Sequence, residues 1–280
     1  MKIIGVDVGA SKIAAGLVIN GKVAKKYVCA TNKKNKGALI EGIINSIEKV
    51  YNKNVKGIGI GLPGAVNEKG FWLESSNIPC VKDINIKRIM EKRFKKEVRV
   101  NNDAKCFTLA EHLFGNGKGK KNILGIIVGT GVGSGIVING KLHSGKNLLA
   151  GEIGMIRYKG QKIEKFCSAA FIKNLAKKYN IRGTPTEISA FARKGNKKAK
   201  KIFSLLGRNI GYLISIAINL LDPDIIILGG GVSNSFGLFA KEMKKSVNEN
   251  LFYSKAKKTK IVKSGLKDAG ILGAAGLFYR

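Results

Sequence analysis

The stretch I-I-G-V-D-V-G at residues 3–9 decides the fold, because a related stretch, I-L-G-I-I-V-G, returns at residues 123–129. Each copy continues through a glycine-containing turn and a second apolar run to an Asn-Gly-Lys triplet, at residues 20–22 and 139–141. An Asn-Gly pair between two apolar runs is the strongest short-range signal for a β-hairpin. A strand, a turn and a hairpin repeated half a chain apart predict two similar α/β domains.

The rest of the chain alternates between helix-like and strand-like patterns. Helices are predicted over residues 39–50, 84–94, 104–114, 169–179, 186–194 and 197–221, and strands over residues 55–60, 98–100 and 225–228. Pro223 ends the last of these helices. Strands that alternate with helices indicate largely parallel sheets, so the fold class is α/β. No linker rich in Pro, Gly or Ser divides the chain, and any hinge is therefore expected to be short and structured.

Length and composition are those of an ordinary globular protein. The 280 residues have room for one large domain or two modest ones, and such a chain needs no disulfide or metal to fold. The four cysteines lie far apart and form no C-x-x-C pair, which argues against a disulfide framework or a zinc knuckle. Apolar runs such as residues 225–232 fall short of the roughly 18 residues of a membrane span, and no signal-peptide pattern is present. We therefore expect a cytoplasmic protein without membrane contact.

The charge is strongly positive, because 51 Lys and Arg residues against 18 Asp and Glu residues give a formal net charge of +33. Such a balance suggests nucleic acid as a partner. Only eight of the basic residues are arginine, the side chain that recognises bases and phosphates bidentately, and the lysines are spread along the chain. We expect no specific nucleic-acid partner, and only weak non-specific binding at low salt.

Three glycine-containing turns are candidates for phosphate binding, at residues 7–12, 129–135 and 229–231. Glycine allows backbone N–H groups to approach an anion closely. Side-chain donors are added by Ser11, Lys12 and Thr130. Asp7, at the end of the first strand, is placed to hold Mg²⁺, usually through water. A single hairpin turn also needs glycine, but two turns in a duplicated setting and a third after an apolar strand favour phosphate binding.

A fourth glycine-rich stretch, at residues 59–64, matches the G-x-G-x-x-G fingerprint of dinucleotide-binding folds. Residues 65–70 have the composition of a turn and not of a helix. No strand that ends in an acidic residue follows at about 20 residues, as that fingerprint requires. A Rossmann fold is therefore not expected, and no Walker lysine motif is present.

Several segments, in the right order, resemble the motifs of the ROK family (repressors, uncharacterised frames and sugar kinases) of the actin-like, hexokinase-like ATPase superfamily. The first phosphate loop is similar to residues 7–13, the sugar-side loop to residues 59–64, the N-D-A motif to residues 102–104, the second phosphate loop to residues 129–133 with 139–141, the A-G-E motif to residues 150–154, the adenosine segment to residues 222–233 and the closing helix to residues 268–275. The resemblance covers nearly the whole chain. It implies two actin-like (ribonuclease H-like) α/β domains around a cleft for ATP and sugar, one of residues 1–110 completed by residues 267–280, the other of residues 111–266.

The resemblance also implies an ATP-dependent sugar kinase in which Asp103 is the general base. Asp103 precedes the predicted helix of residues 104–114, so the position of a helix N-cap is an alternative that is compatible with catalysis. The residues implied to bind the sugar are Gly64, Ser76, Asn77, Asn102, Asp103, Glu152 and Glu164. Those implied to bind the nucleotide are Asp7, Gly9, Ala10, Ser11, Lys12, Gly129, Thr130, Gly131, Gly133, Gly230 and Gly231. ATP and Mg²⁺ are the expected cofactors, and the resemblance allows a homodimer, for which the sequence shows no interface.

Two departures from the family pattern concern the acceptor. Met155 stands where the family usually has a histidine that touches sugar and often zinc, and the family's cysteine-rich zinc loop is missing between Glu152 and Glu164. We therefore predict no zinc site. Glu164 is placed by residues 163–168, I-E-K-F-C-S, which resemble the family's L-E-x-[YF]-A-S.

A hexose such as glucose is the expected acceptor, followed by N-acetylmannosamine or fructose. Met155 keeps two alternatives open, a kinase for an unusual acceptor and a non-catalytic sugar- and nucleotide-binding regulator. Because the first strand begins at Lys2, we expect no helix-turn-helix before it, which argues against a repressor. An actin-like filament protein is a further alternative, against which Asn102, Asp103 and Glu152 argue.

Overall fold

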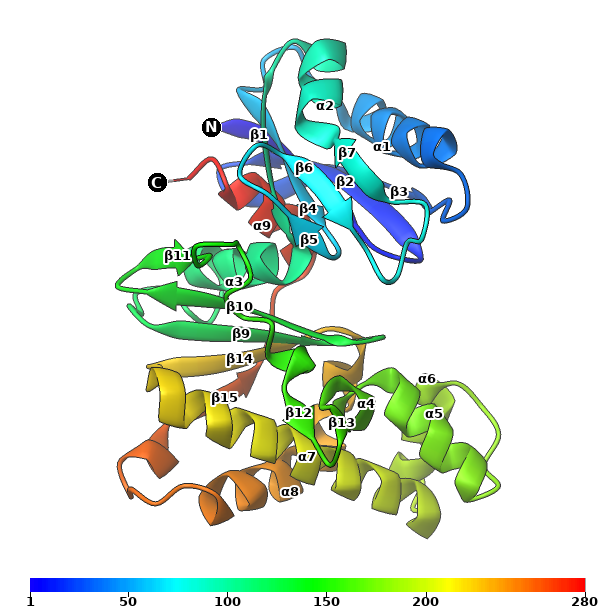
Figure 1. Cartoon of the computed structure of the whole chain (residues 1–280), viewed down its shortest axis with the longest axis vertical. Helices are drawn as coiled ribbons and strands as arrows, with labels where there is room; N and C mark the ends of the chain where they lie inside the picture. Colours follow the sequence, from blue (N-terminus) through cyan, green and yellow to red (C-terminus); the bar gives the residue numbers. More distant parts are fainter. Residues whose placement is uncertain (280) are drawn as a thin grey trace. The chain divides into compact units, whose positions relative to one another are not determined.

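The computed structural model describes residues 1–279. It contains two five-stranded sheets with the orders β3-β2-β1-β4-β8 and β11-β10-β9-β14-β15 (Figure 1). The first sheet consists of β1 (Lys2–Val8), β2 (Lys12–Ile19), β3 (Lys22–Ala30), β4 (Gly57–Leu62) and β8 (Glu97–Asn102), and the second of β9 (Ile123–Val128), β10 (Val132–Ile138), β11 (Lys141–His143), β14 (Ile225–Gly229) and β15 (Lys260–Lys263). The repeated strands β1–β3 and β9–β11 take the same places in the two orders. The predicted duplication and the α/β class are confirmed.

The two hairpins of the repeat turn in the same way. Asn20 and Gly21 have φ values of 50° and 78°, and Asn139 and Gly140 have φ values of 51° and 76°. Two consecutive residues with positive φ define the type I′ turn, whose twist matches that of the strands it joins. The Asn-Gly pairs in the sequence therefore predicted both turns correctly.

The inner strands β1, β2 and β4 of the first sheet are buried on both faces, and along a strand successive residues point to opposite layers. Along β1, Ile4 and Val6 belong to a core shared with α1 (Lys36–Val50), whereas Ile3 belongs to a core shared with α9 (Ala269–Gly276). Near-continuous apolar runs are typical of such doubly covered strands.

Glycines let α9 lie directly on the first sheet. A Cβ at Gly5 of β1 would overlap the carbonyl oxygen of Ile271, and a Cβ at Gly59 of β4 would overlap that of Ala274. On the other side of α9, a Cβ at Gly273 would overlap the backbone of Cys106 in α3 (Asp103–Phe114). The glycines of the rejected dinucleotide fingerprint thus include one that this helix packing requires.

The second sheet has a fully buried inner strand, β14, and a helical layer formed by α7 (Lys197–Leu221) and α8 (Phe236–Glu249). Figure 1 shows α7 in yellow beside α8 in orange. Gly207 and Gly211 of α7 face the backbone of α8, where a Cβ would overlap the carbonyl oxygens of Phe239 and Met243. The predicted bounds of α7 are confirmed, and Pro223 follows its last residue by two positions.

By length and composition alone, α7 is the one helix of residues 1–279 that could span a membrane. Of its most apolar 18-residue window, 56% is buried inside the protein. A core helix of a globular protein has this composition too, so the finding is weak evidence for a membrane span.

Several elements were not predicted. They are the sheet β5-β6-β7 of β5 (Ala65–Val66), β6 (Phe71–Glu74) and β7 (Lys82–Asn85), the hairpin of β12 (Arg157–Tyr158) and β13 (Gln161–Lys162), α4 (Glu164–Cys167), α8, β15 and the short 3₁₀ helices η1 (Ile153–Met155), η2 (Gly231–Ser235) and η3 (Ala256–Lys258). The predicted helix of residues 84–94 begins later, as α2 (Ile86–Phe94), because β7 extends to Asn85, which caps α2. The predicted helices of residues 169–179 and 186–194 are found as α5 (Ala169–Lys178) and α6 (Pro185–Arg193).

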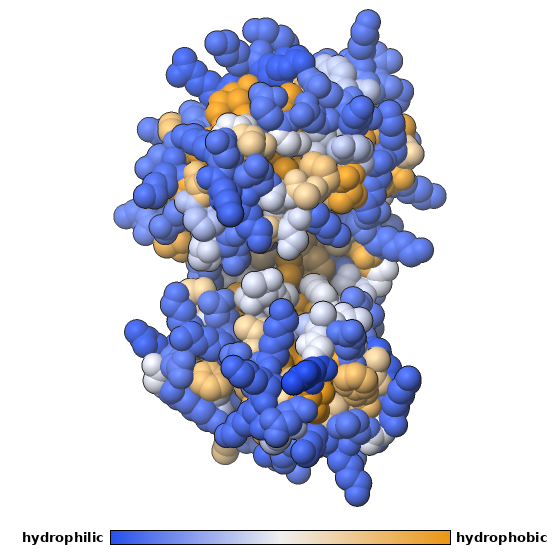
Figure 2. Space-filling view, turned by 90° about the vertical axis from the view of Figure 1, so that its right-hand side faces the viewer, coloured by the Kyte–Doolittle hydropathy of each residue, from blue (hydrophilic) through white to orange (hydrophobic). Residues whose placement is uncertain are grey.

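The described chain forms two compact units. The first comprises Met1–Gly119, Gly135–Ala150 and the residues from Gly265 onward, and the second comprises Lys120–Ser134 and Gly151–Ser264. The predicted domain bounds stay a prediction. On the face drawn in Figure 2, hydrophilic side chains dominate and apolar ones are scattered among them.

Candidate functional site

Asp7 is the last but one residue of β1, and its carboxylate lies against the first turn of α9. A Cβ at Gly270 would overlap Asp7 Oδ2. Burial raises the pKa of Asp7 above its ordinary value, while the ammonium group of Lys12 lowers it and the carboxylate of Asp268 raises it. Asp268 forms an ion pair with Lys26 of β3. No sequence pattern indicated that Gly270, Asp268 and Lys26 lie near Asp7, because only tertiary packing brings them there.

The oxygen donors at Asp7 fit Mg²⁺. This ion keeps several waters and is usually held by one or two carboxylates together with substrate phosphates. Asp7, with Asp268 close enough to shift its pKa, supplies that number of carboxylates. Within residues 1–279, no three His, Cys, Asp or Glu side chains converge on a possible metal position. The absence of zinc stays a prediction.

The first glycine-containing turn lies between β1 and β2 and is fixed from β3. Gly9 N–H donates to the carbonyl oxygen of Lys12 over 2.9 Å, and Thr31 Oγ1 donates to the carbonyl oxygen of Gly9 over 2.7 Å. Thr31 N–H donates to the carbonyl oxygen of Ser11 over 3.2 Å. Ala10 is half-buried, and Ser11 and Lys12 are exposed. The predicted nucleotide residues therefore lie on an ordered turn beside Asp7. Thr31, which was not predicted, stabilises this turn through its two hydrogen bonds.

Asn102 and Asp103 stand where β8 ends and α3 begins. The N-cap of α3 is Asn102 and not Asp103, since Asn102 Oδ1 accepts from the N–H groups of Ala104 and Lys105 over 2.9 and 3.3 Å. The alternative reading of Asp103 as the cap is therefore wrong. Asp103 is the first residue of the helix, where the helix dipole favours a carboxylate.

The loop of Gly64 meets Asn102 directly, because Asn102 Nδ2 donates to the carbonyl oxygen of Gly64 over 3.2 Å. The indole of buried Trp72 holds the same loop, with Nε1 donating to the carbonyl oxygen of Pro63 over 2.8 Å. Gly64 has a φ of 96°, and a Cβ there would overlap the carbonyl oxygen of Glu74. Gly64 thus shapes a turn that is hydrogen-bonded to Asn102, the residue before Asp103, and its role on the sugar side stays a prediction.

Ser76 and Asn77 are exposed and lie in the connection from β6 to β7. Their neighbour Ser75 packs against Gly64, and its Oγ is buried without a hydrogen-bond partner within residues 1–279. The part of Ser76 and Asn77 in a site stays a prediction.

The second glycine-containing turn follows β9. Gly129 N–H donates to the carbonyl oxygen of Gly131 over 2.9 Å, and Ala169 N–H donates to the carbonyl oxygen of Gly129 over 2.8 Å. Thr130 is exposed and Gly133 is half-buried. The N-terminus of α5 therefore stabilises this turn by a hydrogen bond. No sequence pattern indicated this contact.

Glu164 and Glu152 flank the second turn. Glu164 Oε2 accepts from Val132 N–H over 3.4 Å and lies 2.6 Å from the position that a Cβ of Gly131 would take. Glu152 is exposed and follows Gly151, whose carbonyl oxygen accepts from Ser134 Oγ over 2.6 Å. The Glu164 carboxylate thus contacts the second turn directly, whereas Glu152 is placed near it through the backbone of Gly151.

Met155 ends η1 and is 39% exposed. The interval between Glu152 and Glu164 closes through the β12–β13 hairpin, in which Tyr158 packs against Phe166 and Tyr212 at ring-centroid distances of 5.3 and 4.8 Å. An aromatic cluster therefore fills the space beneath this short interval.

Gly230 and Gly231 follow β14. Gly230 has a φ of 82°, and its carbonyl oxygen accepts from Ser233 Oγ over 2.7 Å. Around Gly231 nothing lies within 4 Å of a Cβ position. Gly231 begins η2, so the turn presents open backbone at the carboxyl end of β14.

The strand register brings the candidate site residues of the first unit to the carboxyl ends of the parallel strands β1, β4 and β8. Asp7 pairs with Gly61 of β4, and Gly61 pairs with Asn101 of β8, one residue before Asn102. Burial first, and then the carboxylates of Asp103 and Asp7, raise the pKa of the buried Cys106 thiol well above its ordinary value. Asp7 and Asp103 thus both lie close enough to the buried Cys106 to act on its thiol.

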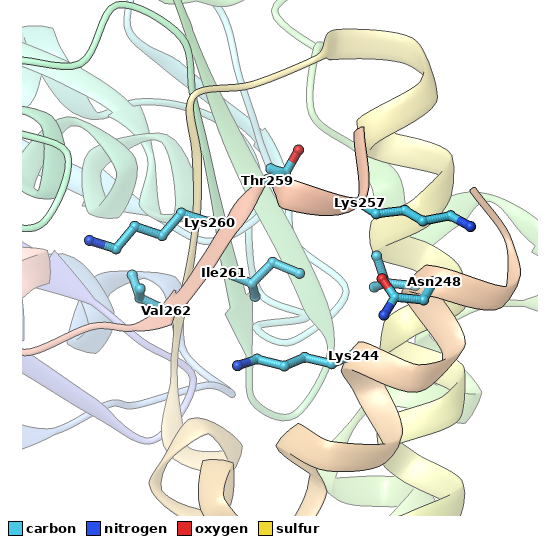
Figure 3. Close-up of a pocket in the computed structure, with 8 residues that line it drawn as sticks. Lys244, Asn248, Lys257, Thr259, Lys260, Ile261 and Val262 are labelled. Atoms are coloured by element: carbon cyan, nitrogen blue, oxygen red, sulfur yellow. The ribbon is translucent and has the colours of Figure 1, made fainter. Parts of the chain in front are cut away.

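The cavity drawn in Figure 3 has a volume of about 420 Å³ and lies between α8 and β15. Lys244, Lys257 and Lys260 are among the residues that line it. None of the predicted site residues does, so this cavity does not belong to the candidate site.

The sequence and the fold of this chain are similar to those of known proteins. The family model described as the ROK family matches residues 3–280. The glucokinase of Thermotoga maritima is 30% identical over 99% of this chain and 97% of its own. The N-acetyl-D-glucosamine kinase of Photobacterium profundum is 33% identical over 98% of each chain. The crystal structure of a ROK family glucokinase from Streptomyces griseus, in complex with glucose and AMPPNP, superimposes with a TM-score of 0.88 at 28% identity over 99% of both chains.

Proposed function

Because the chain belongs to the ROK family and has its two-domain actin-like ATPase fold, we propose that it is an ATP-dependent sugar kinase. It transfers the γ-phosphoryl group of Mg-ATP to a hydroxyl of a hexose. The observation that carries the proposal is the shared sheet edge: Asp7 beside a glycine-containing turn, and Asp103 beside the linked pair of Asn102 and Gly64. Asp7 is thereby available to hold a metal ion, and Asp103 to accept a proton, at the same end of the sheet.

Asp103 accepts the proton of the acceptor hydroxyl as its oxygen attacks the γ-phosphorus in line. A carboxylate at the start of α3 is held rigidly for this task, because Asn102 caps the helix and fixes its position. The sugar hydroxyls are bound by Gly64, Ser76, Asn77, Asn102, Glu152 and Glu164. Carboxylates and amides suit polyols because each donates or accepts in a fixed direction.

The nucleotide is held by backbone N–H groups of the glycine-containing turns, with Ser11, Lys12 and Thr130 adding side-chain donors. Asp7 would hold Mg²⁺, which would neutralise charge on the phosphates. Residues Gly9, Ala10, Gly129, Gly131, Gly133, Gly230 and Gly231 form the turns themselves.

Glucose is the first acceptor to test. The relatives named above are a glucokinase and an N-acetyl-D-glucosamine kinase, whose acceptors share the gluco configuration. Half-exposed Met155 brings a thioether to a place where a polar side chain would offer a hydrogen bond, which favours an acceptor with a less polar group there. N-acetylmannosamine, fructose and an unusual acceptor follow in the panel. A cytoplasmic location, without a membrane or a specific nucleic-acid partner, completes the proposal, and a homodimer is compatible with it.

The test is ADP release from Mg-ATP against a panel of sugars, with Asp103→Asn as the diagnostic variant. One hexose should stimulate release, and D103N should lose about 10²- to 10⁴-fold in kcat, the usual contribution of a general base. Asp83→Asn is the matched control, since Asp83 is exposed and asparagine tolerates its φ of 47°. Retention of full activity by D103N would refute the assignment of the base. Binding of nucleotide and sugar without ADP release would favour the regulator instead.

A further inference from the structure

The carboxylate of Glu164 occupies part of the second phosphate loop. Its Oε2 accepts from Val132 N–H over 3.4 Å and fills the place of a Cβ at Gly131, 2.6 Å away. Gly131 does not have a positive φ, so the feature that distinguishes this position is the close approach of Glu164. A side chain expected to bind the acceptor is therefore in contact with the loop expected to bind phosphate.

One rigid segment holds both the carboxylate and the loop. Ile163, which precedes Glu164, is fully buried and its N–H donates to the carbonyl oxygen of Ile156 over 2.8 Å. Asn209 Nδ2 of α7 donates to the carbonyl oxygen of Phe166 over 3.0 Å. Two residues after α4 ends, Ala169 N–H binds the loop at Gly129. The position of Glu164 on the loop is thus built into the packing and does not depend on a flexible side chain alone.

The carboxylate of Glu164 has no ion-pair partner within residues 1–279. Glu164 is half-buried. Its charge therefore acts on whatever enters the loop, and its Oε2 takes up the N–H of Val132. A phosphate oxygen at the loop would meet a like charge and find one amide already engaged.

We propose that Glu164 couples the acceptor site to the nucleotide site. Without acceptor, its carboxylate lies on the loop of Gly129–Gly133 and weakens the binding of Mg-ATP. A sugar hydroxyl that donates to this carboxylate draws it away from Val132 and shares its charge, so that the loop binds phosphate better. The role of the acceptor rests on the proposed function, whereas the effect of the carboxylate on the loop rests on the contact itself.

Linkage makes the coupling reciprocal. If the acceptor raises the affinity for nucleotide, the nucleotide raises the affinity for acceptor by the same factor. An enzyme of this kind binds ATP weakly until the acceptor is present, which limits the loss of ATP to hydrolysis. The acceptor class is therefore a polyol with a hydroxyl that donates to Glu164.

The experiment measures the binding of Mg-AMPPNP by calorimetry with and without sugar. Glu164→Gln keeps an acceptor for Val132 N–H and removes the charge, and Glu164→Ala removes both. Without sugar, both variants should bind the nucleotide about five- to tenfold more tightly than the wild type, which is the lower end of ordinary site-to-site coupling. Sugar should raise the affinity of the wild type and leave that of E164Q unchanged. Glu249→Gln is the control for the loss of one negative charge, because Glu249 is exposed and pairs with Lys245 on α8.

Equal nucleotide affinity of wild type and E164Q in the absence of sugar would overturn the coupling, whatever the sugar panel shows. An equal gain in E249Q would overturn it as well, since the effect would then come from net charge. If the variants bind nucleotide more tightly but no sugar stimulates ADP release from the wild type, the contact acts as proposed and the kinase function fails. A thermal melt of each variant confirms that it is folded.

Discussion

The two carboxylates of the first unit differ in how the protein supports them. Asp103 stands at the start of a helix whose cap is its neighbour Asn102. Asp7 lies under the first turn of α9, where burial raises its pKa and Lys12 opposes the shift. A residue kept at a cost to stability is typical of a functional position.

Asp7→Asn should therefore stabilise the protein free of nucleotide at neutral pH, by a rise in Tm of about 2–4 °C. Because the folded pKa is raised, an ionised Asp7 destabilises the native state above that pKa. As the pH falls through the raised pKa toward 3.8, the native state takes up a proton that the unfolded state does not, and the wild type recovers. The difference in Tm between D7N and wild type should shrink over that range. An unchanged Tm at neutral pH would contradict the burial argument.

At the scale of elements, α9 joins residues that are far apart in sequence. It lies directly on β1 and β4 and contacts α3, and glycines at each of these places make room for its backbone. The segment from Gly265 onward therefore belongs to the same unit as the first 119 residues. The helix also delivers Gly270 and Asp268 to Asp7.

Gly59→Ala should destabilise the protein by about 3 kcal/mol, the upper end for added volume in a packed core, because the new Cβ would meet the backbone of Ala274, which cannot rotate away. Urea unfolding measures this as a lower midpoint at an unchanged m-value. Gly237→Ala in α8 is the control, since nothing lies within 4 Å of its Cβ position. A midpoint for G59A equal to that of G237A would show that α9 is not in close contact with β4.

At the scale of the whole molecule, the net charge of +33 is carried mostly by exposed lysines. The ion pairs of the described residues involve half-exposed or exposed side chains and contribute little to stability. The lysine-lined cavity between α8 and β15 belongs to the same excess of charge (Figure 3).

Random duplex DNA should accordingly bind weakly at low salt and lose its affinity by about a thousandfold between 50 and 200 mM salt, as phosphate contacts by lysine require. Fluorescence anisotropy with several unrelated sequences measures this. Equal affinity for all of them is the expected result. A preference for one sequence that survives at the higher salt concentration would show a specific nucleic-acid partner.

The sequence alone determined the local features of this protein. The two Asn-Gly turns, the duplicated strands and the long helix of residues 197–221 follow from periodicity and turn chemistry, which depend on neighbours in the chain. The motif order was sufficient to indicate the family that the comparisons show. Short strands such as β5, β12 and β15 were not predicted, because two to four residues are too few to show a hydrophobic periodicity.

The tertiary structure decided which side chains meet. Asn102 rather than Asp103 caps α3 because β8 continues to Asn102, and Gly270 reaches Asp7 because α9 packs on β1. Glu164 contacts Gly131, 33 positions away, because buried Ile163 and the hydrogen bond from Ala169 N–H to Gly129 hold this segment against the second turn. Contacts between distant segments depend on backbone packing distances, and a single sequence does not encode those distances in any local pattern. Local chemistry thus determined the turns and helices, and packing determined the candidate site.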